Sequence, residues 1–125
     1  MSPNFNLQKK SLQISIDFLN CKNKKFLIDL KYFKKVVEKI LKISKIKKIK
    51  SISYVFKNKG FTYLAILKES HLAFHTWPEK KLINLDIFLC NFLQNNEKKV
   101  EKFLLEIEKI IKSDKKNFKR IRRIT

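Results

Sequence analysis

The feature that most restricts the fold of this chain is a run of four segments with β-strand character and no helical segment between them. Apolar and β-branched residues dominate each segment, and polar or turn-forming residues separate one segment from the next. The four segments are 49–56, 61–67, 71–77 and 82–90. The second is apolar throughout, which predicts a strand covered on both faces. The intervening stretches 57–60 and 78–81 are expected to be turns.

Four further segments flank this run. Residues 12–19 alternate apolar and polar side chains, a pattern that predicts a half-buried strand. Residues 29–44 and 97–112 carry apolar side chains at helical spacing, and Asp29 is the expected N-cap of the first helix. The tail, 118–125, is expected to form a last strand.

The resulting order is β-α-β-β-β-β-α-β. Because most strands follow one another directly, this order predicts an α+β fold. We expect a two-layer α/β sandwich with an antiparallel or mixed sheet and helices on one face. No linker or repeat divides the sequence, so residues 1–125 are expected to form a single domain.

The formal net charge is +19, and a basic chain can bind nucleic acid by releasing counterions from phosphates. However, 27 Lys accompany only 3 Arg, and Arg is the residue that binds phosphates and bases through two parallel hydrogen bonds. A bias toward A/T-rich codons would enrich Lys, Asn and Ile without any ligand. We therefore do not expect nucleic acid as the main partner. No apolar run approaches the ~20 residues of a membrane span and no signal peptide is recognisable, which predicts a cytoplasmic protein without a membrane partner.

Rare residues gather in one stretch, 68-KESHLAFHTWPEKK-81, which holds both histidines and the only Trp. Ser70 and His75 could be a nucleophile and a base, but their spacing alone favours a turn residue and a packed core histidine. Cys90 by itself would be a buried core cysteine. Two cysteines and two histidines at these spacings predict neither a disulfide framework nor a metal site.

The run from Glu69 to Glu79, ESHLAFHTWPE, resembles the processing-site signature of the bacterial and archaeal S-adenosylmethionine decarboxylases. In that family the run precedes a strand that ends in Cys, and 82-LINLDIFLC-90 fits that strand. Outside this region, Asp17 and Cys21 match the family's first strand, and Phe56 and Gly60 match the segment before the processing strand. The resemblance covers residues 11–125.

The resemblance implies a cofactor that the chain makes from itself. The hydroxyl of Ser70 would attack the carbonyl carbon of Glu69, and the chain would then break between residues 69 and 70. A covalent pyruvoyl group would replace Ser70, and no metal is implied. His75 would be the base for this processing, and Thr62 occupies the position of a family Ser or Thr that assists by hydrogen bonding.

The resemblance also implies what the pyruvoyl group is for. It would form a Schiff base with S-adenosylmethionine, whose decarboxylation supplies polyamine (spermidine) biosynthesis. Cys90 would return a proton to the substrate. Phe56 and Trp77 could stack on adenine or attract the sulfonium, with core packing as the alternative for both. Glu79 could bind ribose hydroxyls or cap a turn. The family further implies a homodimer of cleaved, two-chain protomers.

Three departures from the family pattern surround the expected pocket: Tyr63 and Asn91 where Gly is usual, and Lys80-Lys81 after the Trp-Pro-Glu run. They leave other functions open. Relatives on the same scaffold decarboxylate arginine or ornithine, so either could be the substrate. A third alternative, of another class, is a non-enzymatic basic binding module or an uncleaved partner subunit.

Overall fold

The structure is a computed structural model, and it describes residues 10–91 and 95–125. It does not describe the first nine residues, which make up most of the N-terminal stretch in which no signal peptide was recognised. The strands are β1 (Lys10–Leu19), β2 (Lys48–Val55), β3 (Phe61–Leu67), β4 (Ser70–Trp77), β5 (Leu82–Leu89) and β6 (Lys115–Ile124). The helices are α1 (Lys24–Ile28), α2 (Leu30–Ile43) and α3 (Glu97–Ile111), with a 3-10 turn, η2, at Pro78–Lys80.

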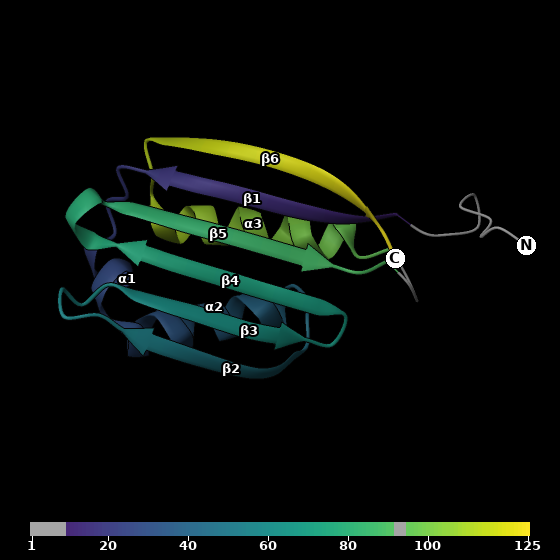
Figure 1. The fold of residues 1–125 in the computed structure, drawn as a ribbon, viewed down its shortest axis with the longest axis horizontal. Coiled ribbons are helices and arrows are strands. Elements are labelled where there is room, and N and C mark those ends of the chain that lie inside the picture. The colour runs from purple at the N-terminus through teal and green to yellow at the C-terminus, as the bar shows by residue number, and fades with distance from the viewer. Residues whose placement is uncertain (1–9, 92–94) are drawn as a thin grey trace, which may run out of the picture.

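All six strands form one antiparallel sheet in the order β2-β3-β4-β5-β1-β6 (Figure 1). The run β2 to β5 forms consecutive neighbours, as the short connections require. β1 then pairs with β5, and β6 closes the other edge beside β1. The predicted α+β sandwich with helices on one face is therefore confirmed, and its sheet is purely antiparallel.

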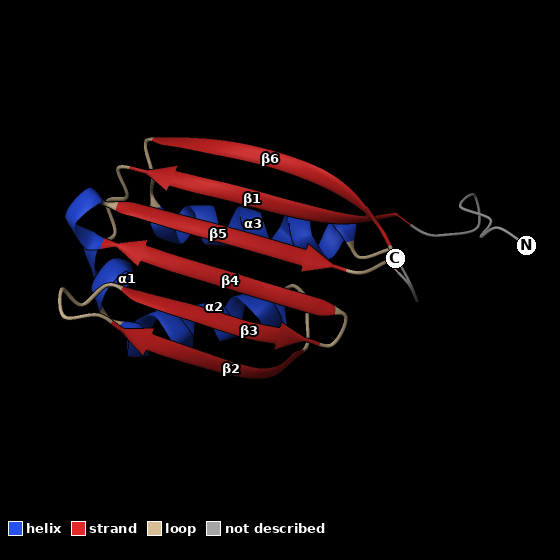
Figure 2. Cartoon of the chain, in the orientation of Figure 1, coloured by secondary structure: helices blue, strands red, loops and turns tan. Residues whose placement is uncertain are grey.

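The helices form a second layer behind the strands (Figure 2). The predicted N-cap is confirmed, because the Asp29 side chain accepts a hydrogen bond from Tyr32 N at 3.0 Å and α2 begins at Leu30. Helix α1 was not predicted: its five residues are too few for a helical period to stand out. The tail strand is confirmed but begins at Lys115, three residues earlier than expected.

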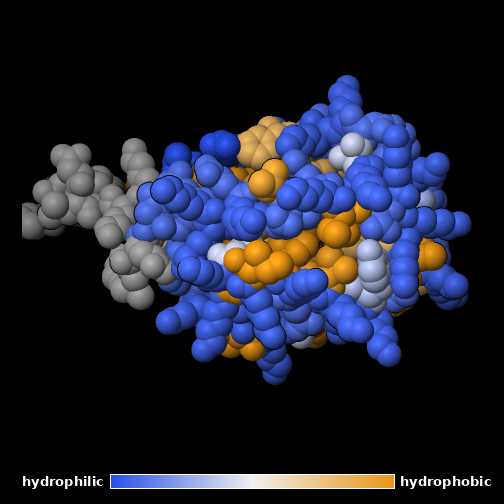
Figure 3. Space-filling model, turned by 180° about the vertical axis from the view of Figure 1, so that it is seen from behind, coloured by the Kyte–Doolittle hydropathy of each residue, from blue (hydrophilic) through white to orange (hydrophobic). Residues whose placement is uncertain are grey.

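The core lies between the two layers and is rich in aromatic rings. Phe33 of α2 is at its centre, with its ring centroid 4.8 Å from that of Phe61, 5.3 Å from Tyr63 and 4.9 Å from Phe74. All four side chains are fully buried. Seen from the helix side, the surface is mostly hydrophilic, with a band of hydrophobic residues exposed within it (Figure 3).

The prediction that 61–67 is covered on both faces is wrong. Phe61, Tyr63 and their alternate neighbours point to the helices, but Leu64 is 45% and Ile66 60% exposed. The helices all lie on one side of the sheet, so no element of the described chain covers the other side. The face of the sheet away from the helices is called the open face below. No helix among the described residues is long and apolar enough to cross a membrane.

Candidate active site

The expected cleavage point lies at the tight turn between β3 and β4. Leu67 pairs with Ser70, so Lys68 and Glu69 form the turn and Ser70 is the first residue of β4. Ser70 also pairs with Leu89, the last residue of β5. Strand pairing therefore brings the end of β5 beside the bond between residues 69 and 70.

Cys90 follows directly after β5, and its backbone N–H donates a hydrogen bond to the carbonyl oxygen of Glu69 at 2.9 Å. This oxygen belongs to the carbonyl that the Ser70 hydroxyl would attack. The interpretation of Cys90 as a buried core cysteine is wrong, because Cys90 is only half-buried. Three predicted residues, Glu69, Ser70 and Cys90, are thus brought together by the sheet.

Cys21 provides the contrast with Cys90. It is only 2% exposed and its Sγ donates to the carbonyl oxygen of Phe18 at 3.3 Å. Burial raises the pKa of the Cys21 thiol to about 11. A thiol held protonated in this way packs like a small apolar side chain, and we assign Cys21 to the core.

Two residues at the cleavage point were not selected by the sequence analysis. His71 places its Nδ1 3.5 Å from the Ser70 Oγ, a long contact, and its exposed ring lies 5.8 Å from that of Phe88. Asn96 is buried, and its Nδ2 donates to Glu69 Oε2 at 2.8 Å. Adjacency to Ser70 could have indicated His71. No pattern in the sequence indicates Asn96.

His75 lies in a different part of the sheet from Ser70. It is five positions further along β4, a distance of roughly 16 Å at the rise of a strand, and an odd separation puts it on the opposite face. The structure therefore does not bring His75 and Ser70 of one chain together. His75 is not a core histidine either: it is half-buried on the open face, where its Nδ1 lies 3.0 Å from Thr62 Oγ1.

A row of polar side chains continues from His75 across the open face. Thr62, His75, Asn84 and Asp17 occupy directly paired positions on β3, β4, β5 and β1. Asn84 Nδ2 donates to Asp17 Oδ1 at 2.7 Å, and Trp77 Nε1 donates to Asn84 Oδ1 at 2.6 Å. The row therefore brings together Asp17, Thr62, Trp77 and His75, which the family resemblance indicated at separate places in the sequence.

The three candidate substrate-binding residues gather at the end of the sheet near η2. The alternative that Phe56 and Trp77 pack in the core is wrong, because Phe56 is 49% and Trp77 40% exposed. The Lys80 Nζ lies 5.6 Å from the centroid of the Trp77 ring. Glu79 accepts a hydrogen bond from Asn58 Nδ2 at 2.6 Å, so it ties the β2–β3 turn to η2.

Gly60 is needed where these two turns meet. A Cβ at this position would lie 2.7 Å from the carbonyl oxygen of Thr76 and 2.8 Å from Pro78 Cδ. Real Cβ atoms do not approach backbone oxygen so closely. The family position that Gly60 matches is thus explained by close approach of two chain segments, without any need for a positive φ.

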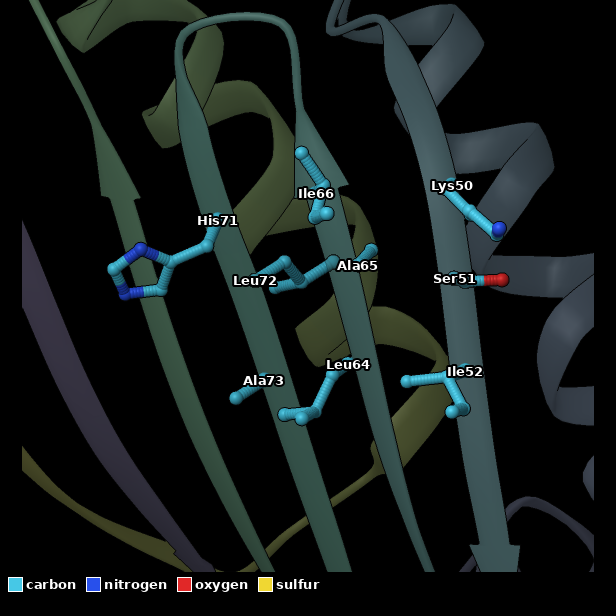
Figure 4. Close-up of a pocket in the computed structure, with 9 residues that line it drawn as sticks. All are labelled: Lys50, Ser51, Ile52, Leu64, Ala65, Ile66, His71, Leu72 and Ala73. Carbon is cyan, nitrogen blue, oxygen red and sulfur yellow. The ribbon is translucent and has the colours of Figure 1, made fainter.

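The open face also holds an apolar hollow of about 440 Å³ over β2, β3 and β4. Figure 4 shows Ile52, Leu64 and Ala73 side by side on these three strands, with His71 at the margin of the hollow. Aliphatic side chains dominate the lining. Within the part of the chain that the structure describes, no group of three His, Cys, Asp or Glu residues could hold a metal ion.

Comparison with known proteins gives consistent matches. A model of the S-adenosylmethionine decarboxylase family matches residues 12–124. The S-adenosylmethionine decarboxylase proenzyme of Archaeoglobus fulgidus is 37% identical over 71 residues, which is 57% of this chain and 63% of that protein. The proenzyme of Picrophilus torridus is 47% identical over 45 residues, which is 36% of this chain and 35% of that protein. The matched stretches therefore span less than two thirds of either relative.

The crystal structure of the adenosylmethionine decarboxylase from Aquifex aeolicus superposes with a TM-score of 0.80 at 23% identity, over 90% of this chain and 89% of that one. At this identity the likeness concerns the fold, which the two chains share.

Proposed function

The chain belongs to the S-adenosylmethionine decarboxylase family, and from that premise we propose that it cleaves itself before Ser70 and then decarboxylates S-adenosylmethionine for polyamine (spermidine) biosynthesis. The observation that carries the proposal is the hydrogen bond from Cys90 N–H to the Glu69 carbonyl oxygen, 2.9 Å long. It polarises the carbonyl that the Ser70 hydroxyl must attack. It also stabilises the negative charge that would form on this oxygen.

The self-cleavage needs only groups at this turn, an imidazole and water. Ser70 Oγ adds to the carbonyl carbon of Glu69, its proton passes through the base to the amide nitrogen, and the C–N bond breaks to leave an ester. The base then removes the α-hydrogen of residue 70, and the Cβ–O bond breaks with Glu69 leaving as a carboxylate. Water replaces the nitrogen, which leaves as ammonia, and a pyruvoyl group begins the fragment 70–125.

The residues present fit such a group, because Ser70 begins a strand and the half-buried Cys90 adjoins it. A pyruvoyl ketone supplies an electron sink for the pair released when a carboxylate leaves as CO₂. Cys90 would hold the proton that returns to the substrate carbon. Phe56 and Trp77 offer exposed aromatic faces to an adenine or a sulfonium, and Glu79 offers a carboxylate to ribose hydroxyls.

The separation of His75 from Ser70 leads to a proposal about assembly. We infer a homodimer in which the open face of one copy meets the β3–β4 turn of the other, so that His75 and Thr62 of the first copy lie beside Ser70 of the second. The apolar side chains exposed on this face, Ile52, Leu64 and Ile66, suit burial against a second copy. Within a single chain the nearer imidazole is that of His71.

Intact-mass analysis of freshly purified protein tests the proposal. Two fragments, 1–69 and 70–125, with a pyruvoyl group at the start of the second, are expected. A chain that stays whole would overturn self-cleavage and favour a binding module or partner subunit. The release of CO₂ from carboxyl-labelled S-adenosylmethionine, compared with arginine and ornithine, tests the substrate. Faster release from either amino acid would reassign the substrate but keep the chemistry.

A further inference from the structure

Asn96 lies where three segments of the chain meet, just before helix α3. It is 1% exposed, and its Nδ2 donates two hydrogen bonds, to Glu69 Oε2 at 2.8 Å and to the Cys90 carbonyl oxygen at 2.7 Å. Its backbone N–H donates to Asn91 Oδ1 at 2.8 Å. One amide group thus ties the β3–β4 turn to the segment that follows β5.

These contacts hold Glu69 at two points. Its carbonyl oxygen accepts from the Cys90 N–H, and its side-chain carboxylate accepts from Asn96. Asn96 also binds the carbonyl of Cys90, so both anchors are connected through one residue. With its carbonyl oxygen and its side chain fixed, Glu69 has little freedom to rotate. The carbonyl carbon then keeps one orientation toward Ser70.

Lysines lie around this junction, but they do not take over the contact that Asn96 makes with Glu69. A hollow of about 200 Å³ beside Glu69 and Asn96 is lined by Lys45, Lys47 and Lys99, among others. In the described residues no ion pair joins these lysines to Glu69, whose carboxylate accepts from a neutral amide. A buried amide holds its partner at a defined angle, whereas a long lysine is mobile.

We propose that Asn96 is a positioning residue for self-cleavage: it holds Glu69 so that the scissile carbonyl faces Ser70 Oγ. The inference rests on the proposed function and names a residue that acts through Glu69. Loss of the Asn96 to Glu69 bond slows cleavage about 10- to 100-fold, because small displacements of reacting atoms reduce rates by such factors. Decarboxylation by protein that has already cleaved is much less affected, since the bond acts before the pyruvoyl group exists.

The test follows freshly synthesised chain in a cell-free system and measures the rate at which it becomes two fragments. Asn96→Asp removes the donor and places a carboxylate against Glu69, so cleavage slows. Asn95→Asp is the matched control: Asn95 is exposed and its Oδ1 accepts from Glu97 N at 2.9 Å, which an Asp can also do. This control cleaves at the wild-type rate.

A second pair of variants separates positioning from folding. Glu69→Ala removes the same bond from the turn side, where a lost side chain leaves the core intact, and it slows cleavage by a similar factor. The double variant Glu69→Gln/Asn96→Asp exchanges donor and acceptor, and it cleaves faster than Asn96→Asp alone. A general loss of structure would not show this rescue.

The outcomes are distinct. If the wild-type chain never cleaves, the proposed function fails and the inference fails with it. If the wild type cleaves, and Glu69→Ala and Asn96→Asp match Asn95→Asp in rate, only the inference about Asn96 is overturned. If Asn96→Asp does not fold, Glu69→Ala alone decides: a wild-type rate in that variant overturns the inference.

Discussion

The backbone N–H of Cys90 lies 2.9 Å from the carbonyl oxygen of Glu69 and donates a hydrogen bond to it. One residue therefore carries two groups of the proposed mechanism. Its amide contacts the carbonyl of the bond that is expected to break, and its half-buried thiol is the proposed proton donor. Because a side-chain substitution keeps the amide, the two contributions can be separated by mutation.

Ser70→Ala is expected to remain one intact chain of 15.0 kDa and to lack decarboxylase activity. Alanine has no hydroxyl to attack Glu69, and the amide bond cannot be converted to an ester. Denaturing gels and intact mass measure the result. Ser113→Ala, which lies far along the chain between α3 and β6, serves as the control and cleaves normally. Two fragments from Ser70→Ala would contradict the proposed chemistry.

Cys90→Ala is expected to cleave into two fragments but to decarboxylate about 10² to 10⁴-fold more slowly. The amide that contacts Glu69 remains, whereas the proton donor is lost, and general acids contribute rate factors of this size. Gels measure cleavage, and CO₂ release measures turnover. Cys21→Ala is the control, because that buried thiol has no part in the site. Full activity in Cys90→Ala would remove the thiol from the mechanism.

His75→Ala is expected to cleave slowly alone, but to cleave when co-expressed with Ser70→Ala. In the mixed dimer, the Ser70→Ala copy supplies His75 to the intact Ser70 of the other copy. Different tags on the two chains identify which one is cut, and the Ser70→Ala chain stays whole. Normal cleavage of His75→Ala by itself, together with no cleavage in His71→Ala, would instead assign the base to His71 of the same chain.

Gly60→Ala is expected to destabilise the fold by about 1–3 kcal/mol, a typical cost of overpacking. The added Cβ would lie 2.7 Å from a backbone oxygen of β4, which cannot rotate away. Thermal unfolding of the single-chain Ser70→Ala form measures the change. Lys57→Ala, in the same turn and exposed, is the control. Equal stability of Gly60→Ala and the parent would mean that the two turns separate without cost.

The Cys21 thiol is expected to make the fold sensitive to high pH. Burial raises its pKa to about 11 in the folded protein, from about 8.5 in an unfolded chain. The folded state therefore keeps a proton that the unfolded state loses. The contribution is complete below about pH 8.5 and is lost as pH rises toward 11. Denaturant unfolding of Ser70→Ala, with and without Cys21→Ala, measures it. Identical alkaline slopes would contradict the assignment.

Much of the fold could be predicted because its elements are periodic. Alternation located β1 and helical spacing located α2 and α3, since each buries one face along its length. Segment 61–67 was predicted wrongly, because that prediction rested on the apolar pattern alone. Its exposed residues, Leu64 and Ile66, are apolar without being covered in the described chain. A sequence pattern shows which side chains are apolar, but it does not show whether a second layer covers them.

Only some residues of the candidate site could be predicted from the sequence. The signature around Ser70 led directly to Glu69, Ser70 and Cys90, which lie together. The same signature contains His75, whose place on the opposite face five residues away could be inferred from strand geometry only once β4 was known to begin at Ser70. Asn96 could not be found, because no rule of spacing connects a residue before α3 with the β3–β4 turn.

The sequence by itself determined the order of the six strands and of helices α2 and α3, and it indicated the reactive residues Ser70 and Cys90, since periodicity and residue type are local properties of a chain. The tertiary structure alone decided which of these residues meet. Hydrogen bonds between β4 and β5 bring residue 90 to residue 69, and those between β3 and β4 place His75 beside Thr62. Such pairing joins distant parts of the chain, and an extended strand holds its own residues apart.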